Sequence, residues 1–291
     1  MTNKKYAITT DSGCDLTYEQ CLEYGIIPLK MSYTDGENIY KDEMKNEKLK
    51  EFYRKMEGGI NYKTSAVNVK EAFDFLENII TEYDELIHIS LGSGISGTYN
   101  NMLLAKDMIL EKYPNKKIYI IDSIAASLGY GMLAIEASIK RRDGMSIEEV
   151  VEYLEEKKHK MNVYFTTSTL TYLARGGRVS NVAAVFGNIL SIKPILKLDV
   201  QGRLEVHCKG HGKKNTFAKV QKLIEDTIIN PEEQTLFVVH SLPEKEVEDY
   251  IEELKKKINF KNVFCNYLGT IIGAHTGPGL IAFFYFGKNR L

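Results

Sequence analysis

The segment 86–99 constrains the fold most, because it joins a strand pattern, a glycine-rich turn and a helix start. An apolar, β-branched run ends near Leu91 and predicts a buried strand. Three glycines and three hydroxyl residues follow between Gly92 and Thr98, and the apolar positions from Thr98 to Leu110 predict a helix. The start of such a helix offers unpaired backbone N–H groups and a positive dipole end, which together favour a bound anion.

The first half of the chain alternates strands with helices. Strand patterns occupy residues 6–10, 26–33, 86–91 and 118–121. Thr17 with Gln20 and Asn68 with Glu71 have the spacing of capping boxes, and Asn46 is expected to cap a helix that runs to about Met56. This alternation predicts an α/β lobe with a mostly parallel sheet.

The second half has a different pattern. Ser146 with Glu149 predicts a capped helix that ends near residue 160, and residues 199–202 form the turn of a predicted hairpin. Strands near 163–167, 236–240 and 263–268 are expected beside helices at 183–190, 214–228 and 244–258. We therefore predict a C-terminal α+β lobe with a mixed or antiparallel sheet, and place the boundary so that the lobes are residues 1–158 and 159–291.

Composition excludes several classes of protein. The 291 residues are 44% hydrophobic with a formal net charge of −1, which argues against a nucleic-acid-binding surface. No apolar run approaches the ~20 residues of a membrane-spanning helix, and no signal peptide is expected before the first strand. The four cysteines have no metal-binding spacing. We expect a cytoplasmic protein with reduced thiols.

The loop after Leu91 has the spelling G-x-G-x-x-G, with glycines at positions 92, 94 and 97. Between a strand and a helix this spelling is typical of dinucleotide binding, so a dinucleotide-dependent oxidoreductase using Gly92, Gly94 and Gly97 is one hypothesis. Asp122 lies 25 residues beyond Gly97, somewhat further than the usual ~20 for the ribose carboxylate. A purely structural turn is an alternative, as is serine hydrolysis, although no G-x-S-x-G spacing is present.

Other candidate residues stand in glycine-rich or basic segments. His275, within Gly273 to Gly279, is expected on a loop as a site residue or as a turn cap. Arg175 and Arg178 flank two glycines and could hold an anion or a partner, or form a solvated turn. A second basic loop is expected at residues 209–214, and His88 is expected in the core.

Several short motifs occur together and in order along the chain. They are Thr10-Asp11-Ser12, Lys63-Thr64-Ser65, Ser96-Gly97-Thr98-Tyr99, Ile121-Asp122-Ser123, Gly176-Gly177-Arg178, Ile192-Lys193-Pro194-Ile195 and the segment Gly273 to Gly279. This ordered set resembles the DegV family of bacterial fatty-acid-binding proteins. The resemblance covers essentially the whole chain and implies two lobes with a fatty acid held between them.

The resemblance also implies a function and a site. Members similar to this chain present the acyl carboxylate to a separate fatty acid kinase, which makes acyl phosphate for phospholipid synthesis, so the chain is expected to be no enzyme itself and to need no cofactor. The implied fatty-acid-binding residues are Thr64, Ser96, Gly97, His275 and Thr276. Two hydroxyls and an imidazole suit a carboxylate.

Partner contacts are expected at three basic residues, Arg175, Arg178 and Lys209. Family members that serve the kinase tend to carry an arginine where this chain has Gly210, and Lys209 replaces its charge but not its planar fork. Residues 125–133 and 185–192 are expected to line the acyl slot. Transient membrane contact is a further expectation.

Overall fold

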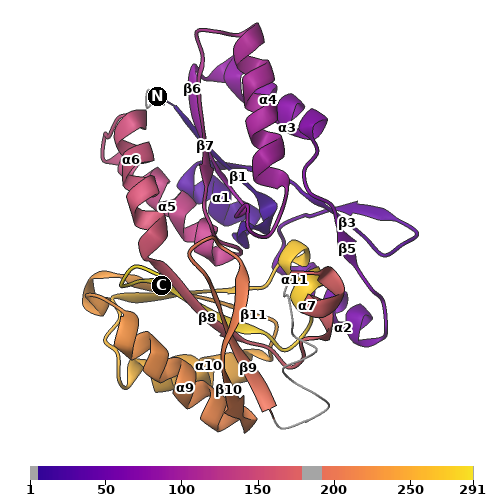
Figure 1. The fold of residues 1–291 in the computed structure, drawn as a ribbon, viewed down its shortest axis with the longest axis vertical. Coiled ribbons are helices and arrows are strands. Elements are labelled where there is room, and N and C mark those ends of the chain that lie inside the picture. Colours follow the sequence, from indigo (N-terminus) through magenta and orange to yellow (C-terminus); the bar gives the residue numbers. More distant parts are fainter. Residues whose placement is uncertain (1–5, 179–191, 291) are drawn as a thin grey trace.

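The computed structural model describes residues 6–178 and 192–290, which fold into two lobes (Figure 1). The N-terminal lobe, indigo to magenta in Figure 1, lies against a C-terminal lobe built on a larger sheet. The predicted fold class is confirmed, since the first lobe has a parallel sheet and the second a mixed one.

The N-terminal sheet has the strand order β2-β1-β6-β7, and all its neighbours are parallel. Its strands are β1 (Ala7–Asp11), β2 (Ile26–Leu29), β6 (Glu85–Ser90) and β7 (Lys117–Asp122). Five helices cover it: α1 (Tyr18–Tyr24), α5 (Leu128–Arg142) and α6 (Ile147–Lys157) on one face, α3 (Val69–Glu82) and α4 (Thr98–Lys112) on the other. Side chains alternate along β6, so that Ile87 and Ile89 pack toward α5 while Leu86 packs toward α3 and α4. A parallel sheet covered on both faces explains why its strands read as continuous apolar runs.

Three helices of this lobe begin as their sequences predict. The side chains of three cap residues, Thr17, Asn68 and Ser146, each accept a hydrogen bond from the backbone N–H three residues on. The side chain of that third residue in turn accepts a hydrogen bond from the backbone N–H of the cap residue. These reciprocal bonds satisfy N–H groups that a helix start leaves without partners. Asn46 is not a cap: it begins a 3-10 turn (Asn46–Lys48), and α2 (Leu49–Glu57) follows without a side-chain cap.

The C-terminal sheet has six strands in the order β10-β9-β8-β13-β11-β12, with only β11 and β12 parallel. The strands are β8 (Met161–Thr166), β9 (Ile192–Leu198), β10 (Leu204–His211), β11 (Thr235–His240), β12 (Asn262–Tyr267) and β13 (Ile281–Phe286). Helices α9 (Gly212–Thr227) and α10 (Glu244–Lys255) cover its outer face. Phe165 and Phe284 point to the inner face, toward the N-terminal lobe, whereas Tyr164 and Phe283 point outward.

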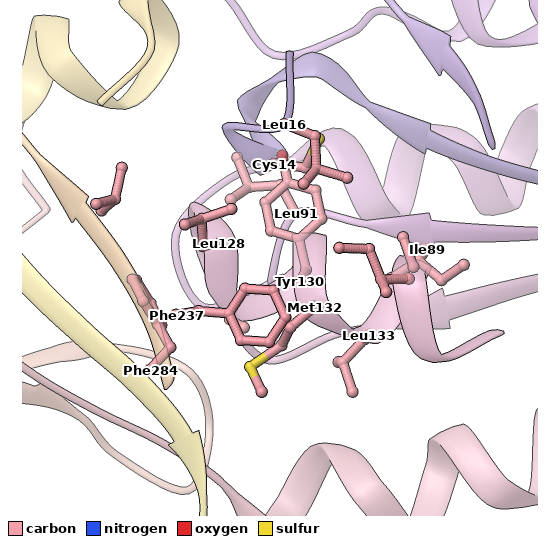
Figure 2. Packing of buried hydrophobic residues seen from close by; sticks show 14 of the residues in the cluster. Cys14, Leu16, Ile89, Leu91, Leu128, Tyr130, Met132, Leu133, Phe237 and Phe284 are labelled. Atoms are coloured by element: carbon pink, nitrogen blue, oxygen red, sulfur yellow. The ribbon is translucent and has the colours of Figure 1, made fainter. Parts of the chain in front are cut away.

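One apolar cluster joins the two lobes. Phe237 and Phe284 of the C-terminal sheet pack with Leu128, Tyr130 and Met132 of α5 (Figure 2). Because α5 contacts β1 as well as β11 and β13, this helix ties the two sheets into one core.

Two short helices and a small sheet complete the inter-lobe region. The strands β3 (Ser32–Thr34), β4 (Ile39–Lys41) and β5 (Lys63–Thr64) form an antiparallel sheet. Helix α11 (Thr270–Thr276) lies against β3, β5 and α2, although it is close to the C-terminus in sequence (Figure 1). It also contacts α7 (Thr171–Gly176). A segment near the C-terminus thus lies in contact with segments from the first quarter of the chain.

Three sequence expectations need correction. Residues 26–33 form two strands in different sheets rather than one, because the chain leaves β2 before Ser32. His275 lies in the last turn of α11 and not on a loop. The predicted basic loop at 209–214 does not form, since β10 continues to His211 and α9 starts at Gly212.

Two further expectations remain as they were. The predicted helix at 183–190 lies outside the described residues. The lobe boundary at residue 158 stays a prediction; the last strand of the first sheet ends at Asp122 and the first of the second begins at Met161.

Candidate functional site

A cavity lies where the two lobes meet. It contains about 590 Å³ of space free of protein atoms, part of it open to solvent. Apolar side chains dominate its wall, and the lining residues are Ile95, Ala126, Ser127, Val163, Phe165, Leu173, Arg178, Leu198, Leu204, Val239, Leu268, Ile272, His275, Thr276, Leu280, Ala282 and Phe284. The polar members are few, which is the usual composition of a small-molecule site.

The imidazole of His275 marks the polar part of this wall. Thr64 on β5 lies beside it, with 2.6 Å between Thr64 Oγ1 and His275 Nε2. Thr276 follows on the same helix, and its hydroxyl donates to the carbonyl of Ile272. The structure therefore brings together Thr64 and His275, which are 211 residues apart in sequence.

Burial favours the neutral form of His275. Loss of solvent, with a smaller effect from the charge of Arg178, lowers the pKa of His275 to about 4. A neutral imidazole still carries one N–H donor, so it can donate a hydrogen bond to an anion although it has no positive charge of its own.

The start of α4 holds the other predicted binding residues. Ser96 Oγ accepts from the backbone N–H of Thr98 at 3.2 Å and lies 3.0 Å from Thr98 Oγ1. Gly97 is the residue before the helix and is exposed. Ile95 next to them lines the cavity, so the positive end of this 15-residue helix lies at the edge of the site.

The glycine-rich loop packs against the protein's own backbone. A methyl group at Gly92 would lie 2.7 Å from the nitrogen of Ala125, and one at Gly94 would lie 2.4 Å from the carbonyl oxygen of Gln201. Asp122 accepts hydrogen bonds from the backbone and hydroxyl of Ser93 at 3.0 and 2.5 Å. Internal packing thus accounts for two of the three glycines of the G-x-G-x-x-G motif and for the aspartate. These residues therefore give no support to a dinucleotide site.

The basic residues assigned to a partner occupy different surroundings. Arg178 lines the cavity and donates to the carbonyls of Ile95 and Gly176. Arg175 is exposed and lies over the ring of Tyr172. Lys209 lies on β10, where its carbonyl accepts a hydrogen bond from Lys219. Their role toward a partner stays a prediction.

The backbone at Gly210 has no room for a side chain. A methyl group there would lie 2.6 Å from Thr216 Cα and closer still to the Thr216 hydroxyl. Strand β10 and the first turn of α9 are therefore in direct contact at this point. An arginine at position 210 would require this contact to open.

Sequence reasoning missed several residues of the site. Of the expected lining segments, 125–133 contributes only Ala126 and Ser127, and 185–191 lies outside the described residues. The inner faces of β8, β11 and β13 supply Val163, Phe165, Val239, Ala282 and Phe284, and the alternating pattern of these strands was a usable signal. Gly176 was also missed: a methyl group there would lie 2.6 Å from His275 Nδ1, so this glycine leaves room for the imidazole.

We expect the protein to lose stability as the pH rises from about 7.5 to about 8.5. Burial raises the pKa of Asp15 to about 8, whereas an unfolded aspartate titrates near ~4, so the folded state binds more protons in this window. Burial also lowers the pKa values of His88, His207, His240 and His275. These residues act oppositely as long as an unfolded histidine, with a pKa near ~6.5, still binds protons, which is up to about pH 7.5. Denaturant titrations should show a fall of about 1 kcal/mol per pH unit, and Asp15→Asn should flatten it. A rise in stability over this window would contradict the expectation.

Within residues 6–178 and 192–290, no group of three or more His, Cys, Asp or Glu side chains is arranged to hold a metal ion. In the same part of the chain, no helix is long and apolar enough to cross a membrane. The four cysteines are free thiols.

An apolar cavity between two lobes, with few polar residues in its wall, has the composition of a small-molecule binding site. The chain belongs to the DegV family, whose model, described as an uncharacterised protein of that family, matches residues 5–288. It is 36% identical over 288 residues to a DegV domain-containing protein of Clostridium perfringens, covering 99% of each chain.

Solved structures of similar proteins have the same fold. DegV from Bacillus subtilis, described as a fatty acid binding protein, is 27% identical with a TM-score of 0.84, covering 98% of this chain and 100% of its own. A DegV family protein from Thermus thermophilus, described by its fatty acid binding, is 26% identical with a TM-score of 0.86, covering 97% and 99%.

Proposed function

We propose that this protein binds a long-chain fatty acid in the inter-lobe cavity. The observation that carries the proposal is the cavity itself, whose wall is apolar except near His275, Thr276, Arg178 and Ser127. Burial of a sixteen-carbon chain at ~0.8 kcal/mol per methylene is worth more than about 10 kcal/mol before the costs of binding. The chain supplies the affinity, and the head group sets the orientation.

The carboxylate is held by Thr64, Ser96 and His275, with Gly97 and Thr276 beside them. The 2.6 Å contact between Thr64 and His275 and the place of Ser96 at the start of α4 support this assignment. A carboxylate here accepts charge-assisted hydrogen bonds and lies near a positive helix end. The relatives from Bacillus subtilis and Thermus thermophilus, both described as fatty acid binders, support the ligand class.

The protein acts as a carrier in the cytoplasm and presents the carboxylate to a separate fatty acid kinase, which forms the acyl phosphate used for phospholipid synthesis. Exposure of Gly97 and Arg178 supports this step, because the head group then lies next to open surface. Arg175, Arg178 and Lys209 offer positive charge to such a partner. Catalysis belongs to the kinase in this proposal.

Native mass spectrometry tests both the binding of a fatty acid and its presentation to a kinase. Protein purified from a bacterial host is expected to carry one acid of about fourteen to eighteen carbons, since each buried methylene adds affinity. After incubation with a fatty acid kinase and ATP, the bound ligand should be heavier by one phosphoryl group. A protein that stays free of ligand when supplied with fatty acids would contradict the binding proposal; an unmodified ligand would contradict the kinase step alone.

A further inference from the structure

The buried carboxyl group of Asp15 links the starts of two helices that contribute to the cavity wall. Asp15 follows the 3-10 turn η1 (Ser12–Cys14), has a left-handed backbone with φ of 57°, and is 5% exposed. Its Oδ2 accepts a short hydrogen bond from the hydroxyl of Ser127, and its Oδ1 accepts from the backbone N–H of Gly269 at 3.0 Å. Its carbonyl accepts from Asn266 Nδ2 at 2.8 Å.

Each of the two side-chain bonds fixes a different part of the site. Ser127 precedes α5 and lines the apolar wall, and its φ of 58° is a strained conformation for serine that an external bond must hold. Gly269 precedes α11, the helix that carries Ile272, His275 and Thr276 into the cavity. One carboxylate therefore sets the separation between the wall and the helix that carries the imidazole.

The contact with Gly269 depends on the absence of a side chain. A methyl group at this position would lie 2.6 Å from Asp15 Oδ1, while the φ of −70° is one that any residue adopts. The glycine is thus required for the approach of the carboxylate and not for the backbone conformation. This is an independent sign that the link is built into the structure.

A buried carboxyl group resists ionisation, because the charged form would lose its hydration. Burial, and to a smaller extent the charge of Asp42, raises the pKa of Asp15, and the bonds from Ser127 and Gly269 offset only part of this effect. An apolar residue could fill the same space at lower cost, but it could not accept two hydrogen bonds from two separate elements.

We propose that Asp15 is a positioning residue for the acyl head group, holding the starts of α5 and α11 so that the apolar wall and the Thr64–His275 pair match one extended ligand. The inference rests on the proposed fatty-acid function. Asp15 does not touch the ligand in this proposal; it acts through Ser127 and Gly269. The consequence is a preference for ligands that carry both a chain and a carboxylate.

The test compares hexadecanoic acid with hexadecanol, which has the same chain but no carboxylate. Dissociation constants are measured by displacement of a fluorescent fatty acid from the wild type and from Asp15→Leu, Ser127→Ala and Gly269→Ala, because leucine has a similar shape but forms neither hydrogen bond. Each variant is expected to bind the acid about tenfold more weakly, with a smaller loss for the alcohol, because the loss of one link misplaces the head group relative to the chain. The ratio of the two constants is the decisive quantity, since general destabilisation would weaken both ligands alike.

Ser138→Ala is the matched control. Ser138 is also a buried serine of α5, and its hydroxyl also donates a short bond to an oxygen, but that oxygen is the carbonyl of Tyr24 and lies away from the cavity. It should leave the ratio unchanged. If Asp15→Leu does not fold, Ser127→Ala still removes one contact from its other end, and Gly269→Ala displaces Asp15 Oδ1 from the other by its methyl group.

The outcomes separate the two proposals. If the wild type prefers the acid but the variants leave the ratio of the two dissociation constants unchanged, the role of Asp15 is contradicted and the fatty-acid function is not. A wild type that binds neither ligand contradicts the fatty-acid function and this inference with it.

Discussion

Replacement of Ala282 by phenylalanine is expected to lower the affinity for hexadecanoic acid about a hundredfold. Ala282 lies on β13, is 3% exposed and lines the cavity. A phenyl ring there would take the space of about four methylenes, and at ~0.8 kcal/mol each the loss is about 3 kcal/mol. Isothermal titration with acids of increasing length measures the effect, and octanoic acid should be affected least because its chain is short.

Ile281→Phe is the control for this substitution. Ile281 is the neighbouring residue on β13 and points to the outer face, where it packs with the cluster under α9 and α10. Added bulk there costs stability, about 1–3 kcal/mol for an overpacked core, but leaves the acyl cavity unchanged. Equal effects of the two substitutions on acid affinity would show that the chain lies elsewhere.

Loss of the imidazole in His275→Ala is expected to weaken fatty-acid binding about 10–150-fold, the value of about 1.5–3 kcal/mol for one hydrogen bond to a charged group. Ser96→Ala should have an effect of the same order. Because Thr64 and His275 lie 2.6 Å apart, Thr64→Val and His275→Ala should give less than the sum of their separate effects when combined. Fluorescence displacement with thermal melts as a check of folding measures these changes.

His159→Ala provides the comparison for the loss of a histidine. His159 is exposed, on the turn after α6, and does not line the cavity. The His159→Ala variant should bind the acid with the affinity of the wild type. An affinity unchanged in His275→Ala as well would place the carboxylate away from the Thr64–His275 pair.

Local sequence was sufficient for most of the elements. The capping boxes of Thr17, Asn68 and Ser146 were predictable because a cap and its partner lie three residues apart and need no tertiary contact. The parallel sheet followed from alternating apolar and helical segments. The short helix at His275 was missed, since a seven-residue helix flanked by glycines has no clear periodic pattern and is stabilised by its contacts with α2, α7 and β3.

The candidate site divides in the same way. The sequence by itself determined the segment 86–99, with a strand, a turn and a helix start that suit an anion, because these depend on neighbours in the chain. Only the tertiary structure decided that Gly92 and Gly94 pack against backbone from residues 125 and 201, and that Thr64 meets His275. Such contacts join residues tens to hundreds of positions apart, and their geometry depends on how α5 and α11 pack between two sheets. The spacing of residues in a sequence does not give the distance between such residues in space, which is determined by packing.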